Sequence, residues 1–151
     1  MSKSEDTWRL YKWESHVIKA HMLPDRLTKR RSMDYLRKYA HKIWAKHGRT
    51  GIDKLDIKAW NATYWQQEKE KWRGWSYSAG FKEMRLGRDF RTEQYVLHEI
   101  THCIGYVWHG RAFLKKYTEL LVEYGGVDEA WLALSMGIYG IKVPDFNPVD
   151  H

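Results

Sequence analysis

The stretch from Tyr95 to Phe113 reads YVLHEITHCIGYVWHGRAF, and it decides how the rest of the chain is interpreted. His98 and His102 stand four residues apart, so on a helix both imidazoles lie on one face, about one turn apart. Two nitrogen atoms presented in this way predict a zinc-binding pair. Glu99 lies roughly 100° around the helix from His98, where its carboxylate can reach a water on the ion without being a ligand. We therefore predict that Glu99 is a general base.

A third ligand is expected at His109, seven residues after His102. On a continuous helix those residues would add about 10 Å, whereas a Zn–N bond is only about 2 Å long. The helix must therefore end, and Gly105 can end it because glycine tolerates the left-handed backbone conformation. Three neutral imidazoles would hold one Zn²⁺ ion and lower the pKa of a bound water to roughly 7, with Glu99 taking its proton.

Other polar residues near the motif have competing interpretations. Glu119 and Glu123 are alternatives for the third ligand, because some zinc peptidases place a glutamate at that spacing, but exposed helix charge is the preferred interpretation. Cys103 is expected to be a small buried side chain rather than a catalytic thiol. Thr92 is expected to cap the helix. The sequence does not choose among four tyrosines that could bind an oxyanion: Tyr106, Tyr117, Tyr124 and Tyr139.

Beyond the first two histidines, the chain continues as His109-Gly110-x-x-Phe113. A third histidine in an H-G-x-x-F/W context after H-E-x-x-H resembles the SprT and Spartan group of zincin-like metallopeptidases. The segment Glu83-Met84-Arg85-Leu86 stands about a dozen residues before the first ligand, as the strand along the cleft does in that group. The similarity covers roughly the second half of the chain, and it implies a peptidase that acts on proteins near DNA.

A second resemblance starts from the segment Arg9-Leu10-Tyr11-Lys12-Trp13-Glu14. It is similar to the R-x-Y-x-x-E helix at the start of small predicted metallohydrolases of actinobacteria and their phages, which also end in a pair of helices. This resemblance implies a metalloprotease-type hydrolase that works in the cytoplasm, which is the host cytoplasm if a phage encodes the chain.

The composition indicates one globular domain over residues 1–151, with flexible tails at 1–6 and 144–151. The chain has 151 residues, of which 43% are hydrophobic, enough for a sizeable core. The first residues, MSKSEDTW, contain no apolar run, so neither a signal peptide nor a membrane span is expected. A single cysteine excludes an internal disulfide and suits a reducing cytoplasm. The sequence leaves the oligomeric state open.

Apolar residues at helical spacing predict helices on both sides of the motif. Glu14 and His16, within the first helix, are expected to be solvated. The predicted helices span about Thr7 to Met22, Met33 to His47, from after His109 to about Tyr124, and from a cap at Asp128 to Ile138.

Between Gly51 and Gly87 the hydrophobic period changes to two. Apolar residues alternate with charged ones around Ile57 and again in 81–86, which predicts strands. We expect an α+β fold of the minimal zincin-like type, in which a small antiparallel sheet packs on the active-site helix. The strand at Met84, Arg85 and Leu86 is expected to bind substrate, because an edge strand can hold an extended peptide through main-chain hydrogen bonds.

The net charge of +7 favours an anionic partner such as nucleic acid. Aromatic residues within 60–77, interleaved with lysine and arginine, could stack bases, although packing over the sheet is the preferred interpretation. The predicted phosphate-contacting residues are Lys29, Arg30, Arg31, Arg37, Lys38 and Lys42.

Two functions follow from these patterns. The first is a zinc-dependent metallohydrolase, a peptidase with Glu99 as general base and a protein or peptide substrate. The second is a non-catalytic protein in which zinc is structural and a basic aromatic surface binds nucleic acid or a partner. Glu99 favours the enzyme, because a structural site is usually closed by four protein ligands and does not need a neighbouring carboxylate.

Overall fold

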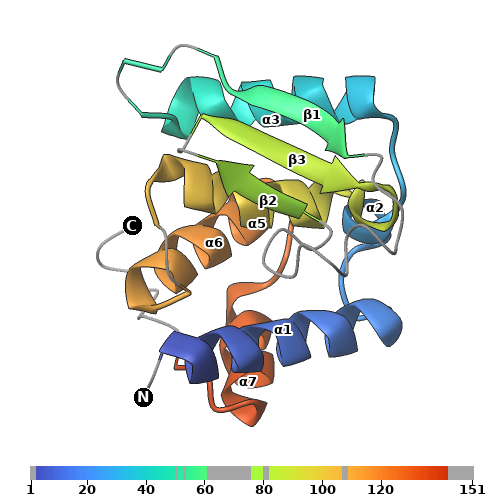
Figure 1. The fold of residues 1–151 in the computed structure, drawn as a ribbon. Helices are drawn as coiled ribbons and strands as arrows, with labels where there is room; N and C mark the ends of the chain where they lie inside the picture. Colours follow the sequence, from blue (N-terminus) through green and yellow to red (C-terminus); the bar gives the residue numbers. More distant parts are fainter. Residues whose placement is uncertain are drawn as a thin grey trace. The chain divides into compact units, whose positions relative to one another are not determined.

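A computed structural model describes residues 3–49, 51–52, 54–60, 76–79, 82–106 and 109–142. The predicted domain comprises two compact units, one formed by 1–26 with 106–151 and the other by 27–105 (Figure 1). A short helix, α2 (Asp25–Thr28), falls where one unit ends and the other begins. In the part of the chain that the structure describes, no helix is both long enough and apolar enough to cross a lipid bilayer.

The unit formed by 27–105 contains a small sheet and two long helices. Its elements are α3 (Met33–His47), β1 (Asp56–Trp60), β2 (Ser76–Ala79), β3 (Glu83–Gly87), the 3₁₀ turn η1 (Arg88–Phe90) and α5 (Glu93–Ile104). The bounds of α3 are those that the sequence predicts. Helices together with a small sheet confirm the α+β class.

The three strands form a mixed sheet in the order β1-β3-β2. Strand β3 runs antiparallel to β2 but parallel to β1, with Ile57 opposite Met84. The prediction of a wholly antiparallel sheet was therefore wrong for the β1–β3 pair. Alternating hydrophobicity locates strands but carries no information about their direction, and the long connection between β1 and β3 permits the crossover that a parallel pair needs.

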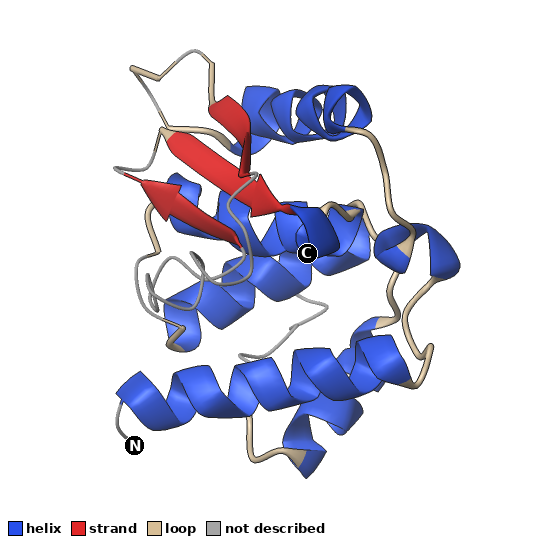
Figure 2. Cartoon of the chain, turned by 45° about the vertical axis from the view of Figure 1, so that its right-hand side comes forward, coloured by secondary structure: helices blue, strands red, loops and turns tan. Residues whose placement is uncertain are grey.

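One face of the sheet is buried, and the other carries charge. Ile57, Met84 and Leu86 are buried, whereas Lys58 forms ion pairs with Asp56 at 3.3 Å and Glu83 at 3.7 Å on the alternate positions. Helix α3 packs against β1 and α5, and α5 contacts β2 and β3 (Figures 1 and 2). The two helices thus share the apolar face, as a sheet with one buried face requires.

The strand that carries Met84, Arg85 and Leu86 does not lie at the edge of the sheet, where the sequence predicts a substrate-binding strand. Strand β3 is central among the described strands, and its main chain is paired with both neighbours. The side chains of Met84 and Leu86 are fully buried, and Arg85 pairs with Glu83 at 2.6 Å. The expected edge position was therefore wrong, because a central strand has no free main-chain edge for a peptide. The role of these three residues in substrate binding stays a prediction.

The unit formed by 1–26 with 106–151 contains three long helices: α1 (Lys3–Lys19), α6 (Arg111–Glu123) and α7 (Glu129–Ile138). Asp128 caps α7 as predicted, because its carboxylate accepts a hydrogen bond from the Trp131 amide at 2.9 Å. Helix α1 begins at Lys3, so most of the predicted tail at 1–6 is helical. The other predicted tail, 144–151, lies outside the described residues.

Buried hydrogen bonds between described residues join the helices of this unit. The indole of Trp13 donates to Ser135 Oγ at 3.0 Å, and the hydroxyl of Tyr117 donates to Glu14 Oε2 at 2.6 Å. Glu14 is only 3% exposed, so its predicted solvation was wrong, whereas His16 is exposed as expected. Glu14 shares a helix face with apolar neighbours and becomes buried because Tyr117 supplies the hydrogen bond that a buried carboxylate needs.

Candidate metal centre

Helix α5 carries the H-E-x-x-H motif between the two ends that its sequence predicts. At its start, the Thr92 hydroxyl accepts a hydrogen bond from the Tyr95 amide at 3.3 Å. At its end, Gly105 has φ 134° and donates its amide hydrogen to the His102 carbonyl at 3.0 Å. A residue with a side chain would be strained at that φ. Both predicted helix ends are confirmed.

The side chains of the motif are placed by this short, buried helix. The rings of His98 and His102 lie 5.3 Å apart between centroids, at an angle of 60°. Glu99 is only 6% exposed, and its Oε2 lies 3.9 Å from His98 Nε2. That distance is too long for a hydrogen bond, so the carboxylate stands beside the imidazole nitrogen rather than bonded to it.

A partly buried ion pair fixes the first turn of α5. Glu93 is 1% exposed, accepts a hydrogen bond from the Tyr35 hydroxyl at 3.1 Å and pairs with Arg31 at 3.4 Å. The Arg31 guanidinium also lies over the Tyr35 ring at 4.5 Å. Loss of Arg31 would leave the buried Glu93 carboxylate without its charged partner. Arg31 therefore stabilises the fold. Cys103 is buried as expected and points its thiol to the Glu83 carbonyl at 3.8 Å.

His109 is held on several sides by residues of its own unit. Its Nδ1 lies 3.0 Å from the hydroxyl oxygen of Thr7. The rings of Tyr11 and Phe113 meet it edge-on at centroid distances of 5.3 and 4.8 Å, and it is 9% exposed. Because Nδ1 faces Thr7, the remaining nitrogen, Nε2, is the atom available to a metal ion.

His98, His102 and His109 form a group that could hold a metal ion. Within the described residues, one ligand nitrogen of each lies within 4.8 Å of the others. Two Zn–N bonds together span about 4.2 Å at most, which is close to this upper limit on the separations. Imidazole ligands suit zinc and also copper, iron and nickel. The residues therefore fit a metal of this class.

The two glutamates considered as alternative ligands are not members of this group. Glu119 forms an ion pair with Lys116 at 3.3 Å on the same helix. Glu123 hydrogen-bonds to Tyr124 at the end of α6, and burial, followed by this bond and the charge of Glu123, raises the Tyr124 pKa to about 12. Their interpretation as helix charge is consistent with these contacts.

The predicted phosphate-contacting residues divide into two classes. Arg37 donates to the Ile57 carbonyl at 2.9 Å and pairs with Asp34 at 3.2 Å, so it fastens α3 to β1, much as Arg31 fastens α5. The exposed members are Lys29, Arg30, Lys38 and Lys42. The aromatic segment predicted to pack over the sheet or stack bases falls largely in 61–75, outside the described residues.

Sequence reasoning missed two arginines that join this basic surface. The Arg31 amide donates to the Arg91 carbonyl at 2.9 Å, which brings Arg30 next to this segment. Burial lowers the pKa of Arg91, and repulsion by Arg30 and Arg88 lowers it further. Arg88 is the first residue of the η1 turn and Arg91 directly follows it, before α5. Their signal in the sequence is the run Arg88-Asp89-Phe90-Arg91, but only the fold brings Arg30 to it.

Comparison of the chain with protein-family models, with curated proteins and with solved structures gives no match. The resemblance to SprT and Spartan metallopeptidases therefore stays a prediction from the motif. An assignment of function depends on the chemistry of the residues themselves.

Proposed function

We propose that this chain is a zinc-dependent metallohydrolase that cleaves peptide bonds. The observation that carries the proposal is the buried Glu99 carboxylate, 3.9 Å from Nε2 of His98, within a motif whose two histidines group with His109. Three protein ligands are typical of catalytic zinc, whereas structural zinc usually has four. A general base beside three imidazoles is the arrangement that hydrolysis requires.

The chemistry divides between the ion and the protein. When bound by the three imidazoles, zinc would polarise a substrate carbonyl and make a water acidic enough to ionise near neutral pH. Glu99 would accept the proton of the attacking water and deliver it to the departing amine nitrogen. The burial of Glu99 excludes bulk water from this transfer and strengthens its interaction with positive charge.

The sheet suggests where an extended substrate would bind. Among the described strands, β2 pairs with β3 on one side, and it also contacts α5, the helix that carries Glu99. We infer that a peptide adds to the main chain of β2 instead of β3. Met84 and Leu86 then support the sheet from the core without touching the substrate.

Thr7 is expected to orient the third ligand. Replacing Thr7 by valine removes the hydroxyl that faces Nδ1 of His109, and loss of such a support typically weakens metal binding by about 10- to 100-fold. Zinc affinity, measured by competition with a chromophoric chelator, should fall by this factor in Thr7→Val. It should recover in Thr7→Ser, which keeps the hydroxyl. Equal affinity in all three proteins would show that Thr7 has no part in the site.

A peptide library tests the proposed activity directly. Zinc-loaded protein should cleave at least one peptide class, and chelator-treated protein should lose cleavage and regain it when zinc is restored. Parallel reactions with single- and double-stranded DNA ask whether nucleic acid stimulates cleavage of DNA-associated proteins. A protein that binds zinc stoichiometrically but cleaves neither peptides nor denatured proteins, with or without DNA, would contradict the peptidase assignment.

The second candidate is a non-catalytic protein that binds nucleic acid. The closeness of Arg30, Arg88 and Arg91 favours it, since clustered arginines are suited to phosphate contacts. In that case zinc would only fasten the histidines together, and Glu99 would be dispensable. The two candidates are not exclusive, because a peptidase of DNA-associated proteins would use both features.

A further inference from the structure

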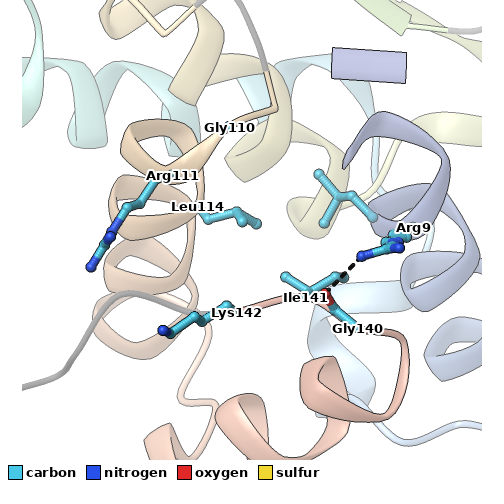
Figure 3. A pocket seen from close by; sticks show the side chains of 8 residues that line it. Arg9, Gly110, Arg111, Leu114, Gly140, Ile141 and Lys142 are labelled. Atoms are coloured by element: carbon cyan, nitrogen blue, oxygen red, sulfur yellow. Dashed lines mark hydrogen bonds between the residues drawn. The ribbon is translucent and has the colours of Figure 1, made fainter. Parts of the chain in front are cut away.

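A separate pocket lies within the unit formed by 1–26 and 106–151. It has a volume of about 200 Å³ and is lined from α1, from the start of α6 and from the residues that follow α7 (Figure 3). Pockets for drug-sized molecules measure roughly 300–1,000 Å³. This one therefore has room for a smaller ligand.

The lining combines an apolar floor with positive charge. Leu10, Leu114 and Ile141 are at most 8% exposed and supply the apolar part. Arg9, Arg111 and Lys142 supply three cations, and the described lining includes no acidic side chain. In Figure 3, Arg9 lies on one side of Leu114 and Ile141, with Arg111 and Lys142 on the other. A hollow lined by charge of one sign favours an anionic ligand over a neutral one.

A glycine positions one of these cations. The Arg9 guanidinium donates to the Gly140 carbonyl at 3.1 Å. A Cβ at Gly140 would lie 3.1 Å from Arg9 Nη1, and the residue has φ 75°, which disfavours other side chains. Glycine at this position therefore lets the guanidinium lie against the backbone at the edge of the pocket.

The start of α6 adds hydrogen-bond donors to the same pocket. Gly110 caps this 13-residue helix without a side-chain hydrogen bond, and the first internal bond runs from the Leu114 amide to the Gly110 carbonyl at 3.0 Å. The amides of the first turn precede that bond, and the positive end of the helix dipole favours an anion there. This feature reinforces the charge of the three cations.

We propose that this pocket binds a small amphiphilic anion, with a carboxylate or phosphate head beside Arg111 and Lys142 and a short aliphatic chain over Leu10, Leu114 and Ile141. The proposal is independent of the metal centre, because its residues include none of the three histidines. For a ligand with one charged head and a short aliphatic chain, we expect a dissociation constant on the order of 1 mM.

Titrations of the full chain with hexanoate, hexyl phosphate, inorganic phosphate and hexanol, followed by backbone amide NMR shifts, test this proposal. Hexanoate or hexyl phosphate should shift the amides of Gly110 and Gly140, and the tighter of the two identifies the head group. Inorganic phosphate and hexanol should each bind at least about tenfold more weakly, because each makes only half of the contacts. Hexanol or inorganic phosphate binding as tightly as the amphiphiles would overturn the proposal, and so would no binding of either amphiphile at 10 mM, about ten times the expected constant.

Charge-removing variants locate the site. Arg111→Gln and Lys142→Gln should each weaken binding by about three- to tenfold, since each removes one charged partner. Lys115→Gln is the matched control, an exposed lysine on α6 outside the lining, and should leave affinity unchanged. Both lining side chains are exposed, and an unchanged melting temperature without ligand would confirm that the variants fold. Wild-type affinity in a variant that combines Arg111→Gln with Lys142→Gln would overturn the assignment.

Discussion

Glu99→Gln is expected to lower peptide hydrolysis by about 100- to 10,000-fold while zinc affinity stays at the wild-type value. The amide is nearly the same size as the carboxylate but cannot accept the proton of the attacking water, and general-base catalysis contributes a factor of this order. Glu99 stands beside His98 Nε2 at 3.9 Å, so its removal leaves the imidazoles in place. Turnover of a cleaved library peptide and zinc stoichiometry, measured on the same preparation, give both quantities.

The matched control for this variant is Glu123→Gln. It makes the same chemical change at an exposed glutamate of α6 that the sequence leaves as an alternative ligand. It should alter neither zinc affinity nor turnover. Full activity in Glu99→Gln would reject the mechanism and favour a structural metal site. If Glu123→Gln lost as much turnover as Glu99→Gln, the activity would depend on a carboxylate of α6 as well, and Glu99 could not be singled out as the general base.

His102→Ala is expected to abolish turnover and to weaken zinc binding by on the order of 1,000-fold. The free energy of zinc binding in small protein sites is roughly 10–16 kcal/mol, so one of a few ligands accounts for several kcal/mol of it. Each 1.4 kcal/mol changes the binding constant about tenfold. Zinc should raise the melting temperature of the wild-type protein and leave that of His102→Ala unchanged, because only a ligand that binds the folded state stabilises it.

His16→Ala provides the comparison for the loss of an imidazole. His16 is exposed on α1 and does not belong to the group of three histidines. The zinc affinity of the His16→Ala protein and its zinc-dependent rise in melting temperature should match those of the wild type. Retention of tight zinc binding by His102→Ala would place the metal elsewhere and would remove the basis for the proposed hydrolase.

Local signals account for the parts of the fold that the sequence predicts correctly. Thr92, Gly105 and Asp128 end or begin helices through hydrogen bonds or backbone angles within a few residues of themselves, so their effect is readable from the chain alone. The i, i+4 spacing of His98 and His102 is also local, because any helix places such residues on one face.

Contacts between distant segments explain the errors. The central position of β3 depends on which strands pair, and neither its alternation nor that of β1 carries this information. Glu14 is buried because Tyr117, 103 residues away, donates a hydrogen bond to it. Arg31 appears in the sequence as part of a basic run, but Glu93 recruits it into a partly buried pair.

By itself, the sequence of this protein determined the helix that carries His98, Glu99 and His102, its two ends and the types of ligand it offers, because helix geometry and caps depend on neighbouring residues. Only the tertiary structure decided that Thr7 faces Nδ1 of His109, that β2 rather than β3 lies at the edge of the described sheet beside α5, and that Arg9 and Gly140 meet at a pocket. Those arrangements depend on the packing of segments far apart in the chain, and the free energy of that packing comes from burial and pairing that no local pattern encodes.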